Sequence, residues 1–233
     1  PLEHHITAYI SIACWNYYCL TRDGQWLRAK AFPLMKAVAD FWVSRVTRND
    51  DGSYSICNVV GADEYANGVD DNAFTNGAAI RALEYACEAA KICNEPVPEI
   101  WEEVGKGIRI LRFKDGVTRE HATYNGEMIK QADVNLLGYP LYFVGDAESQ
   151  KKDMEYYVDK IDPQNGPAMS YSVFCVQYAR MEDAKRAYEM FCRCYQPNLR
   201  APFGVLAETP TSDNPYFMTG AGGLLQAVIN GFC

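Results

Sequence analysis

The chain has 233 residues, 48% of them hydrophobic, which is enough to bury a core in one domain or in a large part of one. Its net charge of −8 at pH 7 and its scattered Lys and Arg residues argue against a nucleic-acid partner. No apolar run approaches the roughly 18 residues that cross a bilayer, and no signal-peptide pattern stands at the start, so no membrane partner is expected.

Nine cysteines are an odd number, and no two of them have CxxC spacing. Cys14, Cys87 and Cys175 lie among apolar residues, where free thiols behave as small hydrophobic side chains. We therefore expect free and mostly buried thiols. The three histidines and the dispersed carboxylates show no metal-ligand spacing, so the sequence predicts neither a metal nor a cofactor.

Apolar residues recur at helical spacing along most of the chain, beginning with Ile6, Ile10 and Ala13. The longest pattern begins near Asp71, and Asp70 or Asp71 is expected to cap its first turn. The predicted helices cover, in chain order, residues 6–20, 34–46, 71–91, 99–108, 130–139, 149–160, 168–180, 183–195 and 217–230.

Strand signals are few and short. Residues 54–60 follow the turn Asn49-Asp50-Asp51-Gly52, and residues 108–113 precede a second turn. Long polar loops cover residues 162–167 and 196–215, and no repeat period indicates a solenoid. The pattern predicts an all-α assembly, closed on itself, with short strands in its loops and the long loops gathered at one end.

The stretch GADEYANGVDDNAFTN, residues 61–76, crowds carboxylates and amides ahead of a helix. A calcium loop starting at Asp63 fails, because its third and twelfth positions would be Tyr65 and Phe74. A helix cap does not account for Asp63 or Glu64, whereas a solvated turn would. Glu64 lies between small apolar segments, and a carboxyl desolvated in this way has a raised pKa, which suits a general acid.

Glu208 ends an apolar run in FGVLAETP and is the candidate partner of Glu64, although it could equally cap the next turn. Lys130 and Gln131 open the predicted helix 130–139. A Lys at a helix start opposes the helix dipole and favours an anionic or hydroxyl-rich neighbour. These junctions between loop and helix are the candidate site.

Four blocks carry a resemblance to a known family: GADEYANGVDDNAFTN, IKQADVNLLGYPL (129–141), GPAMSYSVF (166–174), and AET with FMTGAGGLLQAV (217–228). Together they resemble glycoside hydrolase family 65, which includes disaccharide phosphorylases and inverting hydrolases of the kojibiose and trehalose type. The resemblance implies an (α/α)6-barrel catalytic domain across residues 1–233, incomplete at its N-terminal side. A chain that starts at Pro1 and stops after an apolar helical run agrees with a piece of a longer polypeptide.

The resemblance also implies roles for single residues. Glu64, in the motif Asp63-Glu64-Tyr65, would donate the proton to the glycosidic oxygen. Lys130 and Gln131 would contact the hydroxyls of the cleaved glucose. The expected substrate-binding residues are Asp63, Tyr65, Lys130, Gln131 and, as part of the pocket lining, His5.

The hydrolase branch is favoured by two features of this sequence. Ala66 stands where many family members have His, and Glu208 matches the catalytic Glu of the hydrolases. A carboxylate at that place would repel the phosphate that phosphorylases use as nucleophile, whereas it suits a base that activates water.

We therefore predict an inverting hydrolase that releases β-glucose from an α-linked glucosyl disaccharide or glycoconjugate. The alternatives are a phosphorylase of such disaccharides and a non-catalytic helical module that binds sugar. The expected partners are the substrate, the rest of the same polypeptide and, as a further option, a second copy in a homodimer. By analogy with the hydrolase branch, export to the periplasm or beyond is expected.

Overall fold

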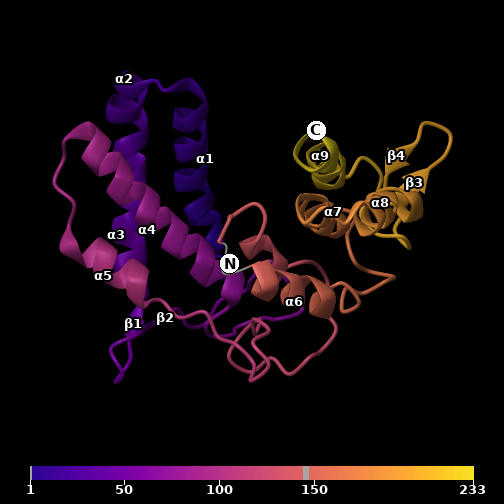
Figure 1. Cartoon of the computed structure of the whole chain (residues 1–233), viewed down its shortest axis with the longest axis horizontal. Coiled ribbons are helices and arrows are strands. Elements are labelled where there is room, and N and C mark those ends of the chain that lie inside the picture. The colour runs from indigo at the N-terminus through magenta and orange to yellow at the C-terminus, as the bar shows by residue number, and fades with distance from the viewer. Residues whose placement is uncertain (1, 144–146) are drawn as a thin grey trace. The chain divides into compact units, whose positions relative to one another are not determined.

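The computed structural model describes residues 2–143 and 147–233, and most of its regular elements are helices (Figure 1). Two compact units, defined by their internal contacts, share the chain. Unit 1 comprises Pro1–Gly61, Asn67–Arg112 and Arg119–Thr123. Unit 2 comprises Ala62–Ala66, Phe113–Thr118 and Tyr124–Cys233. The segment that carries Glu64 therefore belongs to unit 2, although the chain around it belongs to unit 1.

Unit 1 is built around one buried helix, α4. Alanines along α4 allow close packing, and α1, α3 and α5 all contact it. Trp42 and Trp101 fill the largest buried volumes beside it. The helices of this unit are α1 (His5–Thr21), α2 (Gly24–Trp26), the π-helix η1 (Leu27–Ala31), α3 (Phe32–Arg45), α4 (Ala73–Cys93) and α5 (Glu99–Gly107).

The start of α4 differs from the prediction that Asp70 or Asp71 caps it. Asn72 is the capping residue, and its side-chain oxygen accepts from the Thr75 N–H at 2.8 Å. Asp71 has a left-handed backbone, with φ of 53°, and its carboxylate pairs with Arg109 instead. Asp70 accepts from the Asn58 N–H. The two acids stabilise the loop, and the neutral amide caps the helix.

The strands of unit 1 are shorter than predicted. Strand β1 (Thr47–Arg48) pairs antiparallel with β2 (Tyr54–Ser55), and the predicted strand 54–60 ends there because Asn58 turns the chain with φ of 55°. In the predicted strand 108–113, Ile108 forms a bridge to Tyr54 and Arg112 forms a second isolated bridge, but no continuous strand forms.

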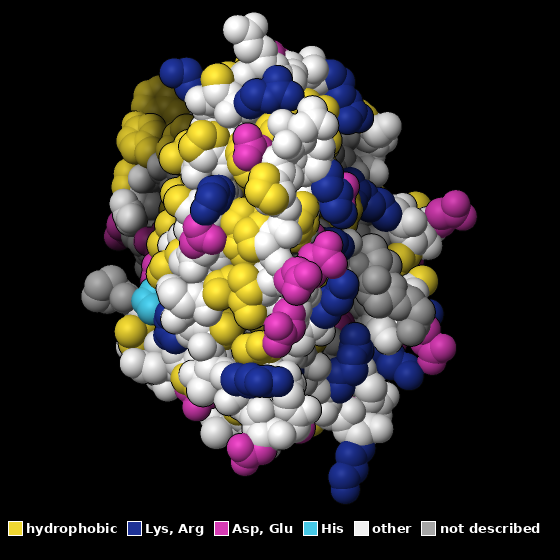
Figure 2. All heavy atoms as spheres, turned by 90° about the vertical axis from the view of Figure 1, so that its left-hand side faces the viewer, with side chains coloured by type: hydrophobic (Ala, Val, Ile, Leu, Met, Phe, Trp, Pro, Cys, Tyr) yellow, Lys and Arg dark blue, Asp and Glu magenta, His cyan; other side chains and the backbone are white. Residues whose placement is uncertain are grey.

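Helical ion pairs cover part of the solvent side of unit 1. Arg81 pairs with Glu84, Lys91 with Glu88, and Lys106 with Glu102, each three or four residues apart. On the face in Figure 2, basic side chains are interspersed with acidic ones.

Unit 2 is built around a second buried helix, α7, which contacts α8, α9 and η4. Phe174, Cys175 and Val176 on α7 are fully buried. Strands β3 (Leu199–Arg200) and β4 (Val205–Leu206) form a hairpin ahead of α9. The helices of this unit are the 3-10 helix η2 (Val134–Leu137), α6 (Ala147–Tyr157), α7 (Ser170–Arg180), α8 (Ala184–Arg193), the 3-10 helix η3 (Gln196–Asn198), α9 (Met218–Gln226) and the π-helix η4 (Ala227–Phe232).

The predicted helix 130–139 is wrong, since only the short η2 forms there. The main-chain N–H of Lys130 donates to the Asp63 carboxylate, and the N–H of Ala132 donates to the Ser170 hydroxyl. Ile129 bridges to Ile161 as in a strand. Asp133, with φ of −123° and ψ of −76°, lies outside the helical region, so no regular helix runs from Lys130 through these residues.

The other predicted helices and the all-α class are confirmed. All nine cysteines are free as expected, but only four of them are buried; Cys87 and Cys175 are among these four, whereas Cys14 is partly exposed. Burial raises the pKa of the Cys175 thiol to about 11. Within residues 2–143 and 147–233, no helix combines the length and the hydropathy that crossing a bilayer requires.

Candidate active site

Three loops of unit 2 carry the candidate side chains. Glu64 lies in Ala62–Ala66, Lys130 and Gln131 precede η2, and Glu208 follows β4 in the loop that leads to α9. The loops come from distant parts of the sequence, and hydrogen bonds join the first two directly.

Glu64 stands at the tip of a turn. The N–H of Ala66 donates to the Asp63 carbonyl, so Glu64 and Tyr65 occupy the two central positions, whose side chains point outward. The Glu64 side chain is 49% exposed, and its carboxylate pairs with the Lys130 ammonium. The predicted desolvation of Glu64 is therefore not found in this chain, because the turn lifts the side chain away from its apolar neighbours.

The Lys130 ammonium interacts electrostatically with both candidate acids. Its side chain is only 21% exposed. The hydrogen bond to Glu64 raises the pKa of Lys130, and the negative charges of Glu64 and Glu208 raise it further, although burial opposes them. An anionic neighbour for Lys130 was expected, and the structure provides one. Glu64 and Glu208 are thus brought within electrostatic reach of one cation.

The side chains of Asp63 and Gln131 form hydrogen bonds with main-chain groups of these loops. Asp63 is 2% exposed, and its Oδ1 accepts from the N–H groups of Lys130 at 2.7 Å and Tyr65 at 3.2 Å. The amide of Gln131 donates to the carbonyl of Ala62. Their contact with substrate stays a prediction, whereas their part in joining two loops is observed.

Tyr65 is held by its hydroxyl. It donates to Asp162 Oδ2 at 2.8 Å, and its ring remains half exposed. The N–H groups of Asn165 and Gln164, with the Asn165 amide, hold the pKa of Asp162 far below its usual range. The bond to Asp162 also raises the pKa of Tyr65.

Glu208 is half-buried, and neutral groups hold its own main chain. The buried Asn198 amide donates to the carbonyls of Ala207 and Glu208 at 3.1 Å each. The N–H of Ala168 donates to the Glu208 carbonyl at 3.0 Å. The alternative that Glu208 caps the next turn is not supported, because its carboxylate bonds Asn214 and α9 has no side-chain cap.

His5 lies in unit 1, whereas the other candidate residues belong to unit 2. Its ring is buried against the rings of Tyr9 and Phe74. Burial lowers the pKa of His5, which favours the neutral imidazole. Its contact with substrate stays a prediction.

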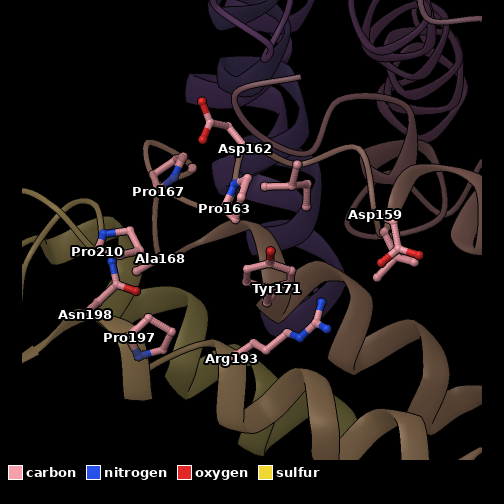
Figure 3. A pocket seen from close by; sticks show the side chains of 13 residues that line it. Asp159, Asp162, Pro163, Pro167, Ala168, Tyr171, Arg193, Pro197, Asn198 and Pro210 are labelled. Atoms are coloured by element: carbon pink, nitrogen blue, oxygen red, sulfur yellow. The ribbon is translucent and has the colours of Figure 1, made fainter. Parts of the chain in front are cut away.

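A pocket of about 340 Å³ adjoins these loops, with four prolines in its walls (Figure 3). Asp162 and Asn198, which hold Tyr65 and the Glu208 main chain, both line it. Glu64, Lys130 and Glu208 do not. In Figure 3 the Asp162 carboxylate points away from Tyr171 and Arg193. The described part of the chain contains no group of three His, Cys, Asp or Glu residues that could hold a metal ion.

Sequence reasoning missed Asp133, Asp162 and Asn198. Asp133 accepts from the N–H groups of Ala62 and Asp63, directly ahead of Glu64. A local signal was present, since Asp133 is a single acid between the apolar residues Ala132 and Val134. Asp162 and Asn198 lie in polar loops, where such residues commonly shape turns, so no local signal separates them.

Residues 1–108 match the family described as glycosyl hydrolase family 65 central catalytic domain. The kojibiose hydrolase of Mucilaginibacter mallensis is 50% identical over 232 residues, which cover 100% of this chain and 34% of that protein. The periplasmic acid trehalase of Saccharomyces cerevisiae is 31% identical over 249 residues, which cover 98% of this chain and 20% of that protein. The chain thus spans about a third or less of the length of these relatives.

The fold has a counterpart among solved structures. A candidate kojibiose phosphorylase from the human microbiome matches with a TM-score of 0.72 and 16% identity, over 97% of this chain and 39% of that one. The likeness agrees with the predicted class, part of an (α/α)6 barrel with short strands in its loops. Since the sequence match to the hydrolases runs along the whole chain, the chain belongs to glycosyl hydrolase family 65.

Proposed function

We propose that this chain carries the acid and the base of an inverting glycoside hydrolase that acts on α-linked glucosyl disaccharides or glycoconjugates. One observation supports this most: Glu64 pairs with the Lys130 ammonium, and the negative charge of Glu208 also raises the pKa of Lys130, so the same cation interacts with both acids. The chain spans only part of its relatives, so the proposal concerns the full polypeptide. Residues 1–233 would form part of one (α/α)6-barrel catalytic domain, with the missing side of the barrel supplied by the rest of that polypeptide.

The proposed reaction moves two protons. Glu64, in its neutral form, gives a proton to the glycosidic oxygen as the bond to C1 breaks. A water molecule attacks C1 from the opposite face, and Glu208 takes the proton that this water loses. The products are β-glucose and the free aglycone. The two carboxyl groups of an inverting enzyme stand about 6.5–9.5 Å apart, which leaves room for the water.

The ion pair between Lys130 and Glu64 would have to open during this cycle. Lys130 has three N–H donors, and hydroxyl groups of a bound glucose can accept from them. When the sugar takes Lys130, Glu64 loses its fixed partner and meets the glycosidic oxygen. Lys130 would thus bind substrate and, in its absence, hold Glu64 in place.

Variants of the two acids in the full-length protein test the proposal. Glu64→Gln and Glu208→Gln should each lower kcat on kojibiose or trehalose by about 10³-fold, because proton transfer is lost. Azide should restore turnover of Glu208→Ala and yield the β-glucosyl azide, since it can attack where water did. Azide should not restore cleavage of a disaccharide by Glu64→Gln.

The same experiments separate the alternatives. Release of glucose 1-phosphate that depends on phosphate would establish a phosphorylase, and full activity in both Gln variants would reject the two acids. A sugar-binding module would bind the disaccharides without turning them over. Secretion or a periplasmic location, as for the yeast relative, would be consistent with the expected export.

A further inference from the structure

We propose that Asp133 is a positioning residue that sets the reach of Glu64 toward the glycosidic oxygen; this inference rests on the proposed function. Asp133 is not among the residues predicted to touch substrate. It lies fully buried, two residues after Gln131. Its carboxylate bonds the chain that leads into the Glu64 turn.

The bonds of Asp133 converge on one oxygen. Oδ2 accepts from the Ala62 N–H at 2.8 Å and from the Asp63 N–H at 3.2 Å, and these residues are 71 and 70 positions away. Hydrogen bonds to an ionised acceptor are about twice as strong as neutral ones. A buried carboxylate depends on such donors, so displacing the Ala62–Asp63 backbone would remove two of them and is unfavourable.

A second set of bonds returns from the Glu64 turn to the Lys130 segment. The Asp63 carboxylate accepts from the Lys130 N–H, and the Gln131 amide donates to the Ala62 carbonyl. Each segment therefore gives a carboxylate to the main chain of the other. The reciprocal bonds fix the peptide groups directly before Glu64 relative to Lys130.

Asp133 is itself held independently of Glu64. The neighbouring Ala132 is buried and donates its N–H to the Ser170 hydroxyl at the start of α7, and Val134 is buried on the other side. The Glu64 turn is thus connected, through Asp133 and Ala132, to α7, the buried helix of unit 2. Since a 1 Å error in placing a catalytic group can lower the rate by about 10²-fold, this support should be visible in kinetics.

The test uses Asp133→Asn and Asp133→Glu in the full-length protein, with two substrates. A disaccharide needs a proton on its leaving oxygen, whereas α-glucosyl fluoride leaves with little proton assistance. Asp133→Asn weakens both bonds, and Asp133→Glu keeps the charge but moves the oxygen. We expect kcat on the disaccharide to fall by about 10²-fold in either variant, and kcat on the fluoride to stay within about threefold, with KM little changed.

Asp153→Asn is the matched control, because Asp153 also accepts a main-chain N–H from a distant segment of unit 2, that of Thr118 at 2.7 Å. It should affect both substrates alike. Equal losses on both substrates in the Asp133 variants, or no loss, would overturn the inference, because a general structural defect is not selective for the leaving group. If one of the two Asp133 variants does not fold, the other variant decides between these outcomes.

Glu64→Gln, measured in parallel, keeps this failure apart from failure of the proposed function. Glu64→Gln should itself show the leaving-group preference. If it does and the Asp133 variants do not, only the positioning role fails. If Glu64→Gln shows none, the proton donor has been misassigned, and the positioning role fails together with it.

Discussion

The loops of the two candidate acids are held by different kinds of bonds. The Glu64 turn is tied by buried or anchored carboxylates, those of Asp133, Asp63 and Asp162. The Glu208 loop is tied by the Asn198 amide and by Arg200, whose guanidinium donates to the carbonyls of Thr209, Pro210 and Ser212. The Glu64 turn therefore rests on acidic side chains that accept hydrogen bonds, and the Glu208 loop on an amide and a guanidinium that donate them.

This difference has a functional reading under the proposed mechanism. The general acid must release and regain a proton in each cycle, and charged bonds around its turn keep its main chain fixed while that occurs. The base accepts a proton from a water molecule. Because water is small and can reorient, the base needs less exact positioning than the acid, which must meet the oxygen of a bulky leaving group. Lys130 is the group common to both regions, because both acids act on its ammonium.

Lys130→Met should lower activity more than the two variants that follow, since it removes the cation shared by both acids and keeps a similar side-chain length. We expect kcat/KM on the disaccharide to fall by about 10²-fold, with a raised KM from the lost sugar contacts. Steady-state kinetics with both substrates measure this. A variant that loses activity only on the disaccharide would show that Lys130 serves the acid alone.

Asn198→Ala should disturb the Glu208 loop alone. It leaves the carbonyls of Ala207 and Glu208 without their buried donor, which costs about 1–3 kcal/mol of unfolding free energy. We expect about a tenfold loss of kcat that is the same for the disaccharide and the fluoride, because water activation is needed in both. Urea unfolding gives the stability, and a loss confined to the disaccharide would contradict the assignment of this loop to the base.

Asp162→Asn should give the smallest effect, about threefold in kcat, because Tyr65 remains on the same turn. The pKa of Asp162 is lowered in the folded protein, so its contribution to stability is present above its unfolded value, near 3.9, and is lost as pH falls below it. Solvent screens this contribution to at most about 1 kcal/mol. Urea midpoints of wild type and variant should therefore differ from pH 8 to pH 5 and converge below about pH 4; a constant difference down to pH 3 would contradict this.

Most of the helices could be predicted from the sequence because their apolar faces are local patterns. The prediction for 130–139 was wrong because the segment is held in place by Asp63 and Ser170, which lie 67 and 38 residues away from their partners, and such distant bonds leave no local pattern. The cap of α4 was assigned to the wrong residue for a similar reason: the Asp71 carboxylate forms an ion pair with the distant Arg109.

Glu64 was found as a carboxylate between small apolar segments and Glu208 as an acid at the end of an apolar run, and the family resemblance pointed to both. The residues that hold them were not, with Asp133 as the main example, because a bond across 71 residues leaves no periodic trace in the sequence. Burial of Glu64 was predicted from its neighbours and is wrong, because turn geometry, not hydrophobicity, decides where the side chain points.

The stereochemistry of the first product tests the central claim most directly. Proton NMR of the full-length enzyme, recorded on a disaccharide substrate before the anomers equilibrate, should show β-glucose as the first sugar released from an α-linkage. Initial release of α-glucose would place both carboxyl groups in a retaining arrangement, and glucose 1-phosphate would replace water by phosphate; either result would contradict the roles given to Glu64 and Glu208.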